Sequence, residues 1–175
     1  MRAAIALATL IMTAPAMAAD PITVPLGMAD VPIHDSATGP DWSGFYAGVY
    51  GVGQLGGDAE AVGLGVSLGY NAALEFVLVG AEVSVQGLAV EGDTTAYGQL
   101  LGRAGVFVSD EVMVYAAGGY GLQLGTTAED AFLLGGGVEL ALNDDVTLRG
   151  QYLRELPNNG GDAGNQFSLG ANFHF

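Results

Sequence analysis

The last eleven residues, NQFSLGANFHF, alternate between apolar and polar or small side chains up to the final position. In an extended chain, one face would carry Phe167, Leu169, Ala171, Phe173 and Phe175. The opposite face would carry Gln166, Ser168, Gly170, Asn172 and His174. This period of two predicts a β-strand with one apolar and one polar face, and the strand continues to the last residue.

Similar runs, rich in Val, Leu, Gly and Tyr, recur from Trp42 onward and are separated by short acidic or Asn/Gly-rich breaks. No segment has a convincing helical period. The predicted strands, eight in all, are 43–54, 61–70, 76–89, 95–108, 112–124, 130–142, 146–154 and 165–175. Most of them reach the ~9–11 residues that a tilted strand needs to cross a bilayer.

The two faces of these runs differ in a consistent way. One face is apolar, as with Val62, Leu64 and Val66, whereas the other holds Gly, Ser and Gln with few charges. A soluble sandwich would place charged side chains on the solvent face of most strands. We therefore predict an all-β fold, an eight-stranded antiparallel up-and-down transmembrane β-barrel over residues 42–175, with lipid outside and small polar groups inside. Phe45 and Tyr46 compete for the outer face of the first strand.

Four charged residues lie on the polar faces of the predicted strands: Glu82, Arg103, Glu139 and Arg149. A tight hairpin within EGDT would place Glu82 opposite Arg103, and a turn within NDD would place Glu139 opposite Arg149. Because an unpaired charge in a narrow lumen is costly, we predict that these are two lumen ion pairs. They would act as a gate for small ions or as structural plugs, and the plug is favoured because eight strands enclose a space that side chains can fill.

The N-terminal segment has the features of an export signal. A positive start at Arg2 precedes a short apolar core, and Ala16 and Ala18 form an A-x-A pattern, so we predict a signal peptide over residues 1–18. Residues 19–41 contain four prolines and no period, which indicates a flexible periplasmic leader. After cleavage, three arginines would remain against 19 acidic residues, a charge of −16. That charge argues against nucleic acid as a partner.

Two segments resemble a known family. DWSGFYAGVYGVG, at Asp41–Gly53, is similar to the start of porin-like outer-membrane β-barrels and surface antigens of Gram-negative bacteria, especially alphaproteobacteria, of the OmpA/OmpX-type small barrel. SLGANFHF resembles the C-terminal signature of such barrels. The resemblance implies that Phe173 and Phe175 belong to a C-terminal assembly signal read by the barrel assembly machinery. Neither motif specifies a biochemical activity.

Other motifs give no support for catalysis. Gly51–Gly56 matches the phosphate-binding pattern G-x-G-x-x-G, but a strand rather than a helix is predicted after it. Ser168 and His174 share a face, yet six residues along a strand separate them by about 20 Å. His34 and His174 are far apart in sequence. We predict no catalytic residue, no metal ligand and no cofactor, and therefore no enzyme.

Acidic and aromatic residues are expected at both ends of the barrel. The breaks on the outer side carry Asp58, Glu60, Glu91, Asp93, Glu129, Asp130, Glu155 and Asp162, and the opposite turns carry Glu75, Asp110, Glu111, Asp144 and Asp145. We interpret them as solvated loops, with bridging of divalent cations to lipopolysaccharide as the alternative. Aromatic girdles are predicted from Phe45, Tyr70, Phe173 and Phe175 at the periplasmic rim and from Phe132, Tyr152 and Phe167 at the outer rim.

These observations predict an integral protein of the cell outer membrane, structural or porin-like, with a largely plugged lumen and both mature termini in the periplasm. Its expected partners are outer-membrane lipid, lipopolysaccharide and the barrel assembly machinery, and a monomer is favoured. One alternative is a surface binding module, an adhesin or a haem- or cation-capturing protein, which would need extended loops. The other is a soluble periplasmic ligand-binding barrel, which would keep its apolar face inward.

Overall fold

The computed structural model describes residues 41–56, 60–90, 93–125 and 130–175. The predicted signal peptide and residues 19–40 of the predicted leader lie outside this description. The described chain forms the strands β1 (Gly44–Gly56), β2 (Ala61–Leu74), β3 (Val77–Val90), β4 (Asp93–Ser109), β5 (Val112–Leu124), β6 (Asp130–Ala141), β7 (Val146–Pro157) and β8 (Gly164–His174). All eight predicted runs are strands, and β2, β4 and β7 are longer than predicted by three or four residues and β1 by one.

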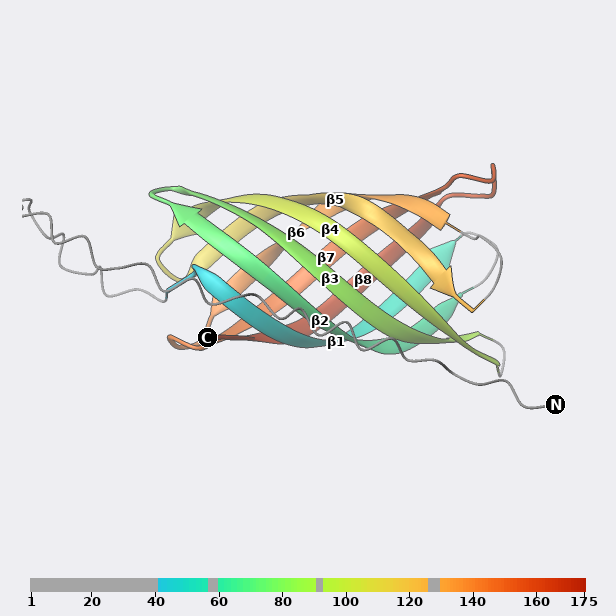
Figure 1. Cartoon of the computed structure of the whole chain (residues 1–175), viewed down its shortest axis with the longest axis horizontal. Helices are drawn as coiled ribbons and strands as arrows, with labels where there is room; N and C mark the ends of the chain where they lie inside the picture. The colour runs from blue at the N-terminus through green and yellow to red at the C-terminus, as the bar shows by residue number, and fades with distance from the viewer. Residues whose placement is uncertain (1–40, 57–59, 91–92, 126–129) are drawn as a thin grey trace, which may run out of the picture. The chain divides into compact units, whose positions relative to one another are not determined.

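Each strand is hydrogen-bonded to the next in antiparallel orientation, and β1 also pairs with β8, so the sheet is a closed barrel (Figure 1). This confirms the predicted fold class. Closure satisfies the backbone hydrogen bonds of both would-be edge strands, which is what a sheet surrounded by hydrocarbon requires. Among the described residues no helix is long and apolar enough to cross a membrane.

The barrel has two ends, which we call the terminus end and the loop end. At the terminus end β1 begins and β8 finishes, and the Phe175 backbone N–H donates to the Phe45 carbonyl oxygen at 2.9 Å. The connections β2–β3, β4–β5 and β6–β7 lie at this end too. The loop end carries the other connections, of which the one between β7 and β8 spans residues 158–163.

The apolar face of the sheet points outward. Leu64 is 76% exposed and Leu169 is 72% exposed, whereas Glu139 and Tyr46 are fully buried inside. The same facing holds along β2, β3, β4 and β7, as predicted. A soluble ligand-binding barrel needs its apolar residues turned inward, so this alternative is contradicted by the observed facing. Phe45 takes the outer position at the start of β1 and Tyr46 the inner one, which settles the competition between them.

The hairpin between β3 and β4 differs in register from the prediction. It closes between Val90 and Asp93, so Glu82 lies opposite Leu101 and Arg103 lies opposite Gly80. The predicted turn was centred one residue too far along the chain, which shifts every cross-strand partner by two positions. The β6–β7 hairpin has the predicted register, with Glu139 directly opposite Arg149.

Candidate functional site: the filled lumen

The four predicted lumen charges are all buried inside the barrel, and they form two ion pairs. Arg103 Nη1 donates to Glu139 Oε2 at 3.1 Å, and Arg149 pairs with Glu82. These partners are exchanged relative to the predicted pairs, Glu82–Arg103 and Glu139–Arg149, so the predicted pairing is wrong. Both observed pairs join strands that are not neighbours in the sheet.

The exchange has a physical reason in the narrow interior. Side chains on all strands point toward one axis, so a long side chain can reach a partner across the lumen as well as one on the next strand. Asn71 Oδ1 accepts hydrogen bonds from Arg103 Nε at 3.0 Å and Nη2 at 2.9 Å, which directs the remaining nitrogen toward Glu139. Register arithmetic on adjacent strands does not include such contacts.

Each carboxylate has additional donors that offset its loss of water. Tyr46 Oη donates to Glu82 Oε2 at 2.6 Å. Thr147 Oγ1 and Asn172 Nδ2 donate to Glu139 Oε1 at 2.5 and 2.7 Å. Buried charges are tolerated when they are both paired and hydrogen-bonded, and here two cations face two anions in a network with no net charge.

Tyrosine rings fill the space around the two guanidinium groups. Arg103 Cζ lies 4.6 Å from the ring centroid of Tyr46 and 5.3 Å from that of Tyr115. Directly opposite each of these tyrosines, on the neighbouring strand, is a glycine: Gly69 opposite Tyr46 and Gly137 opposite Tyr115. A Cβ at Gly69 would overlap the Tyr46 ring, so the glycine makes the room that the ring occupies.

A second polar layer consists of glutamines. Gln166 Oε1 accepts hydrogen bonds from Gln99 Nε2 at 2.8 Å and Gln86 Nε2 at 3.2 Å, with Gln54 Nε2 at 3.5 Å. Tyr50 Oη donates to Gln86 Oε1 at 3.2 Å. We call Gln54, Gln86, Gln99 and Gln166 the glutamine layer. Alternation predicted that Gln86, Gln99 and Gln166 lie on polar faces, but it did not predict that they bond to one another. The repeated occurrence of glutamine at inward positions was the sequence feature that could have indicated this layer.

The terminus end of the lumen is covered by Trp42. Its buried ring lies 5.7 Å from Phe107 and 6.2 Å from His174, between centroids, and its Nε1–H donates to the Asp110 carbonyl oxygen at 3.2 Å. His174 is buried beneath it, stacked on Tyr46 at 5.5 Å, with Nε2 3.5 Å from Glu139 Oε1. His174 therefore belongs to the same network as the ion pairs.

The structure shows no group of three or more His, Cys, Asp or Glu that could hold a metal ion within the described ranges. Ser168 and His174 both face inward on β8, with Gly170 and Asn172 between them on that face. Gly51–Gly56 lies within β1, and the next element that the structure describes is the strand β2. His34, Asp58, Glu91 and Glu129 lie outside the described residues.

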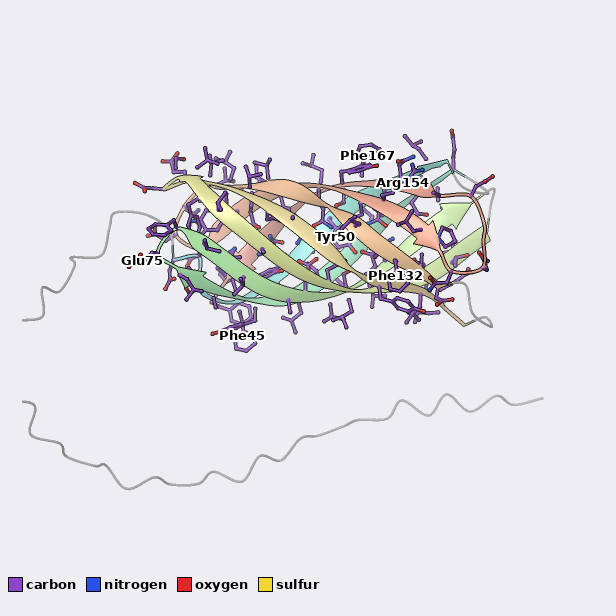
Figure 2. The ribbon with its side chains drawn as sticks, turned by 90° about the horizontal axis from the view of Figure 1, so that it is seen from above. Phe45, Tyr50, Glu75, Phe132, Arg154 and Phe167 are labelled. Atoms are coloured by element: carbon purple, nitrogen blue, oxygen red, sulfur yellow. The ribbon has the colours of Figure 1, made fainter. Side chains whose placement is uncertain are left out.

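Aromatic pairs occur on the outer surface toward both ends. Phe45 and Tyr70 lie 5.0 Å apart, and Tyr152 and Phe167 also lie 5.0 Å apart, between centroids. Figure 2 shows Phe45 in the half of the barrel whose end carries Glu75, the terminus end, and Phe132, Arg154 and Phe167 toward the loop end. Phe173 and Phe175, the residues of the predicted assembly signal, are exposed on the outer surface at the terminus end. Paired aromatic belts are typical of membrane barrels.

This fold and interior define a small closed β-barrel with an apolar outer face, which is the architecture of small outer-membrane barrels. No protein-family model matches the chain, and no curated protein matches it. The likeness is one of structure. The attachment invasion locus protein Ail of Yersinia pestis superposes with a TM-score of 0.56 at 14% identity, over 76% of this chain and 97% of that one.

Two further solved structures are similar. Neisserial surface protein A has a TM-score of 0.52 at 16% identity, over 76% of this chain and 98% of that one. A de novo designed transmembrane β-barrel has a TM-score of 0.51 at 14% identity, over 74% of this chain and 95% of that one. At these identities the likeness shows the fold, and the designed barrel has that fold without an evolved activity.

Proposed function

We propose that this chain is an integral outer-membrane protein with a structural role, whose lumen is closed to ions and solutes. The observation that carries the proposal is the succession of three layers across the lumen: Trp42 with His174, the ion-pair network, and the glutamine layer. Their members are buried, apart from the half-buried Gln54, so continuous water would have to break hydrogen bonds in each layer. The terminus end would face the periplasm, and the barrel would be a monomer.

Planar-bilayer recording tests this proposal. We expect the refolded wild-type barrel to give no stable conductance steps. Removal of one whole ion pair, Glu82→Ser with Arg149→Ser, takes away two long side chains without leaving an unpaired charge and should produce measurable conductance. Val83→Ser, on the lipid face of the same strand, is the matched control and should stay silent. Stable steps from the wild-type protein would contradict a closed lumen.

A gated pore is the second candidate. Glu139 and Arg149 are opposite each other on β6 and β7 but bond to other residues, so an alternative pairing is within reach without any change of backbone register. In this case the current through the wild-type protein would alternate between closed and open levels. Replacement of Glu139 by a neutral residue, as in Glu139→Gln, would change the fraction of time that the pore is open.

A surface binding module has less support. Such a module needs extended loops, and at most six residues separate one strand of the barrel from the next along the chain. The name of Ail refers to attachment and invasion, but that name describes the Yersinia protein. We also propose lipopolysaccharide and the barrel assembly machinery as the partners of this chain, the latter through Phe173 and Phe175 on the exposed face of β8.

A further inference from the structure

Arg154 differs from the other arginines of the barrel. Arg103 and Arg149 are buried in the lumen, whereas Arg154 is exposed on the outer face of β7, between the outward-facing Tyr152 and Leu156. Within the described ranges it takes part in no ion pair, and it is the only Lys or Arg there that lies outside the lumen. This outward-facing cation therefore has no carboxylate partner among the residues that the structure describes.

The guanidinium is held in place from the neighbouring strand. Asn165, the cross-strand partner of Arg154 on β8, accepts from Arg154 Nη1 at 2.8 Å and from Tyr152 Oη at 2.9 Å through its Oδ1. The Asn165 Nδ2 group donates to the Leu55 carbonyl oxygen at 3.2 Å, which fixes the amide itself. Arg154 Nε and Nη2 donate to no described residue, so they are available to an acceptor from outside.

The depth of Arg154 matches a membrane interface. Figure 2 shows Arg154 toward the loop end, on the same side of the barrel's length as Phe167 and Phe132, which belong to the aromatic pairs Tyr152–Phe167 and Tyr120–Phe132. An arginine on the lipid face of a barrel is costly at the bilayer midplane and much less so near the interface, where its head can reach anionic headgroups. The preferred partner of a guanidinium there is a phosphate, which can accept two parallel hydrogen bonds.

Two carboxylates described near this end, those of Asp130 and Glu155, are bound to other residues and do not pair with Arg154. The side chain of Asp130 on β6 accepts from Asn158 Nδ2 at 2.7 Å, and Glu155 on β7 accepts from Gln54 Nε2 at 2.8 Å. Both carboxylates thus have donors of their own. Arg154 is thus the one cation outside the lumen in the described part of the barrel, and neither of these carboxylates pairs with it.

We infer that Arg154, positioned by Asn165, binds a phosphate of lipid A in the leaflet that surrounds the loop end. The inference rests on the proposed outer-membrane function with the terminus end in the periplasm, because lipid A occupies the opposite leaflet. It adds to that function a lipid site made of Arg154, Tyr152 and Asn165, with the aromatic ring of Phe167 beside the acyl-chain region.

The test uses arginine side-chain NMR. The full chain is refolded in a maltoside detergent, which carries no phosphate, and EDTA excludes bridging by divalent cations. Lipid A with both phosphates is then titrated while the Nε–Hε signals of Arg103, Arg149 and Arg154 are followed. We expect the Arg154 signal to shift saturably and the two lumen signals to stay in place, because they are buried away from lipid.

Variants give the second readout. Arg154→Gln should weaken lipid A binding about fivefold, the effect of one interfacial cation near an anionic surface. Arg154→Lys should keep most of the affinity. Leu156→Gln, at the next outward position of β7, is the matched control and should leave the affinity unchanged.

The outcomes separate this site from the function on which it rests. No Arg154 shift, or an equal shift with dephosphorylated lipid A, with phosphatidylglycerol or with inorganic phosphate, would overturn the lipid A assignment. Heat-dependent gel mobility and the silent bilayer recording of the same preparation would then still support the closed membrane barrel. Loss of those two properties would instead remove the proposed function itself.

Discussion

At the scale of single residues, each buried charge in the interior of this barrel has several hydrogen-bond partners, whereas Ser67 Oγ, Asn71 Nδ2 and His174 Nδ1 are buried without one. Glu139 illustrates this, since its two oxygens accept from Arg103, Thr147 and Asn172. The inward facing of Glu82, Arg103, Glu139 and Arg149 could be predicted from alternation, because each falls on the polar face of its strand. Glu155, predicted in an outer break, also lies on the inward side of β7 and accepts from Gln54. The hydrogen-bond partners of these residues could not be predicted. A contact across the lumen joins strands that are not neighbours, and the spacing of residues along two neighbouring strands does not report it.

Replacement of one member of the network should be strongly destabilising. Glu139→Gln leaves Arg103 without its anion in a buried site, and we expect the free energy of unfolding to fall by about 3–5 kcal/mol. Urea unfolding in lipid vesicles measures the change. Glu111→Gln, in the exposed β4–β5 turn, is the control and should stay within about 0.5 kcal/mol of the wild type. Equal effects of the two substitutions would show that the network contributes nothing specific.

Glycine at position 69 should be required by the packing of Tyr46. A methyl group there would overlap the tyrosine ring, so Gly69→Ala is expected to cost about 1–3 kcal/mol of stability through overpacking. Gly150→Ala is the matched control, because no heavy atom lies within 4 Å of a Cβ built at that position in β7. The same unfolding experiment compares them, and a Gly69→Ala variant as stable as Gly150→Ala would rule out the steric requirement.

At the scale of the strands, period-two alternation is enough to predict each element and the face that it buries. The eight strands arise where predicted, and the differences are at their ends: β2 continues to Leu74 and β7 to Pro157. These extensions run through less apolar sequence, and pairing with the neighbouring strand maintains them. The register of β3 with β4 depended on the turn geometry at Val90 and Asp93, which alternation does not specify.

The last strand offers a test of the assembly signal. Deletion of Phe175 should reduce the amount of folded barrel in the outer membrane, because it removes an exposed aromatic residue from the end of β8 that the assembly machinery is proposed to read. Phe167→Ala, on the same face of β8 but toward the loop end, is the control and should assemble normally. Heat-dependent gel mobility of outer-membrane fractions gives the folded amount. Normal assembly without Phe175 would argue against the signal.

At the scale of the whole molecule, the barrel is an apolar cylinder with a polar interior, the reverse of a soluble protein. The arrangement is stable only where hydrocarbon surrounds it, since dozens of exposed Val, Leu and Phe side chains would otherwise face water. This orientation links the fold to the proposed localisation. It also means that the position of a side chain along the barrel axis, such as that of Arg154, corresponds to a depth in the membrane.

The cost of a charge on the outer surface should therefore depend on depth. Leu100→Lys, near the middle of β4, is expected to lose about 2–4 kcal/mol of folding free energy in vesicles, because it places an ammonium in hydrocarbon. Val108→Lys, near the terminus end of the same strand, should lose about 0–1 kcal/mol, since its side chain can reach the interface. Equal losses at the two positions would contradict a membrane-spanning barrel.

The number of strands, their antiparallel order, the apolar face of each and the inward facing of Glu82, Arg103, Glu139 and Arg149 follow from local alternation and from the short connections, so they can be predicted from the chain alone. The pairing of Arg103 with Glu139 and of Arg149 with Glu82, the convergence of the glutamines on Gln166 and the position of Trp42 over the terminus end depend on the folded barrel. Closure of the sheet brings side chains from strands that are distant in the sequence to one axis. Which of them pair there depends on distances across the lumen, and local sequence patterns do not encode these distances.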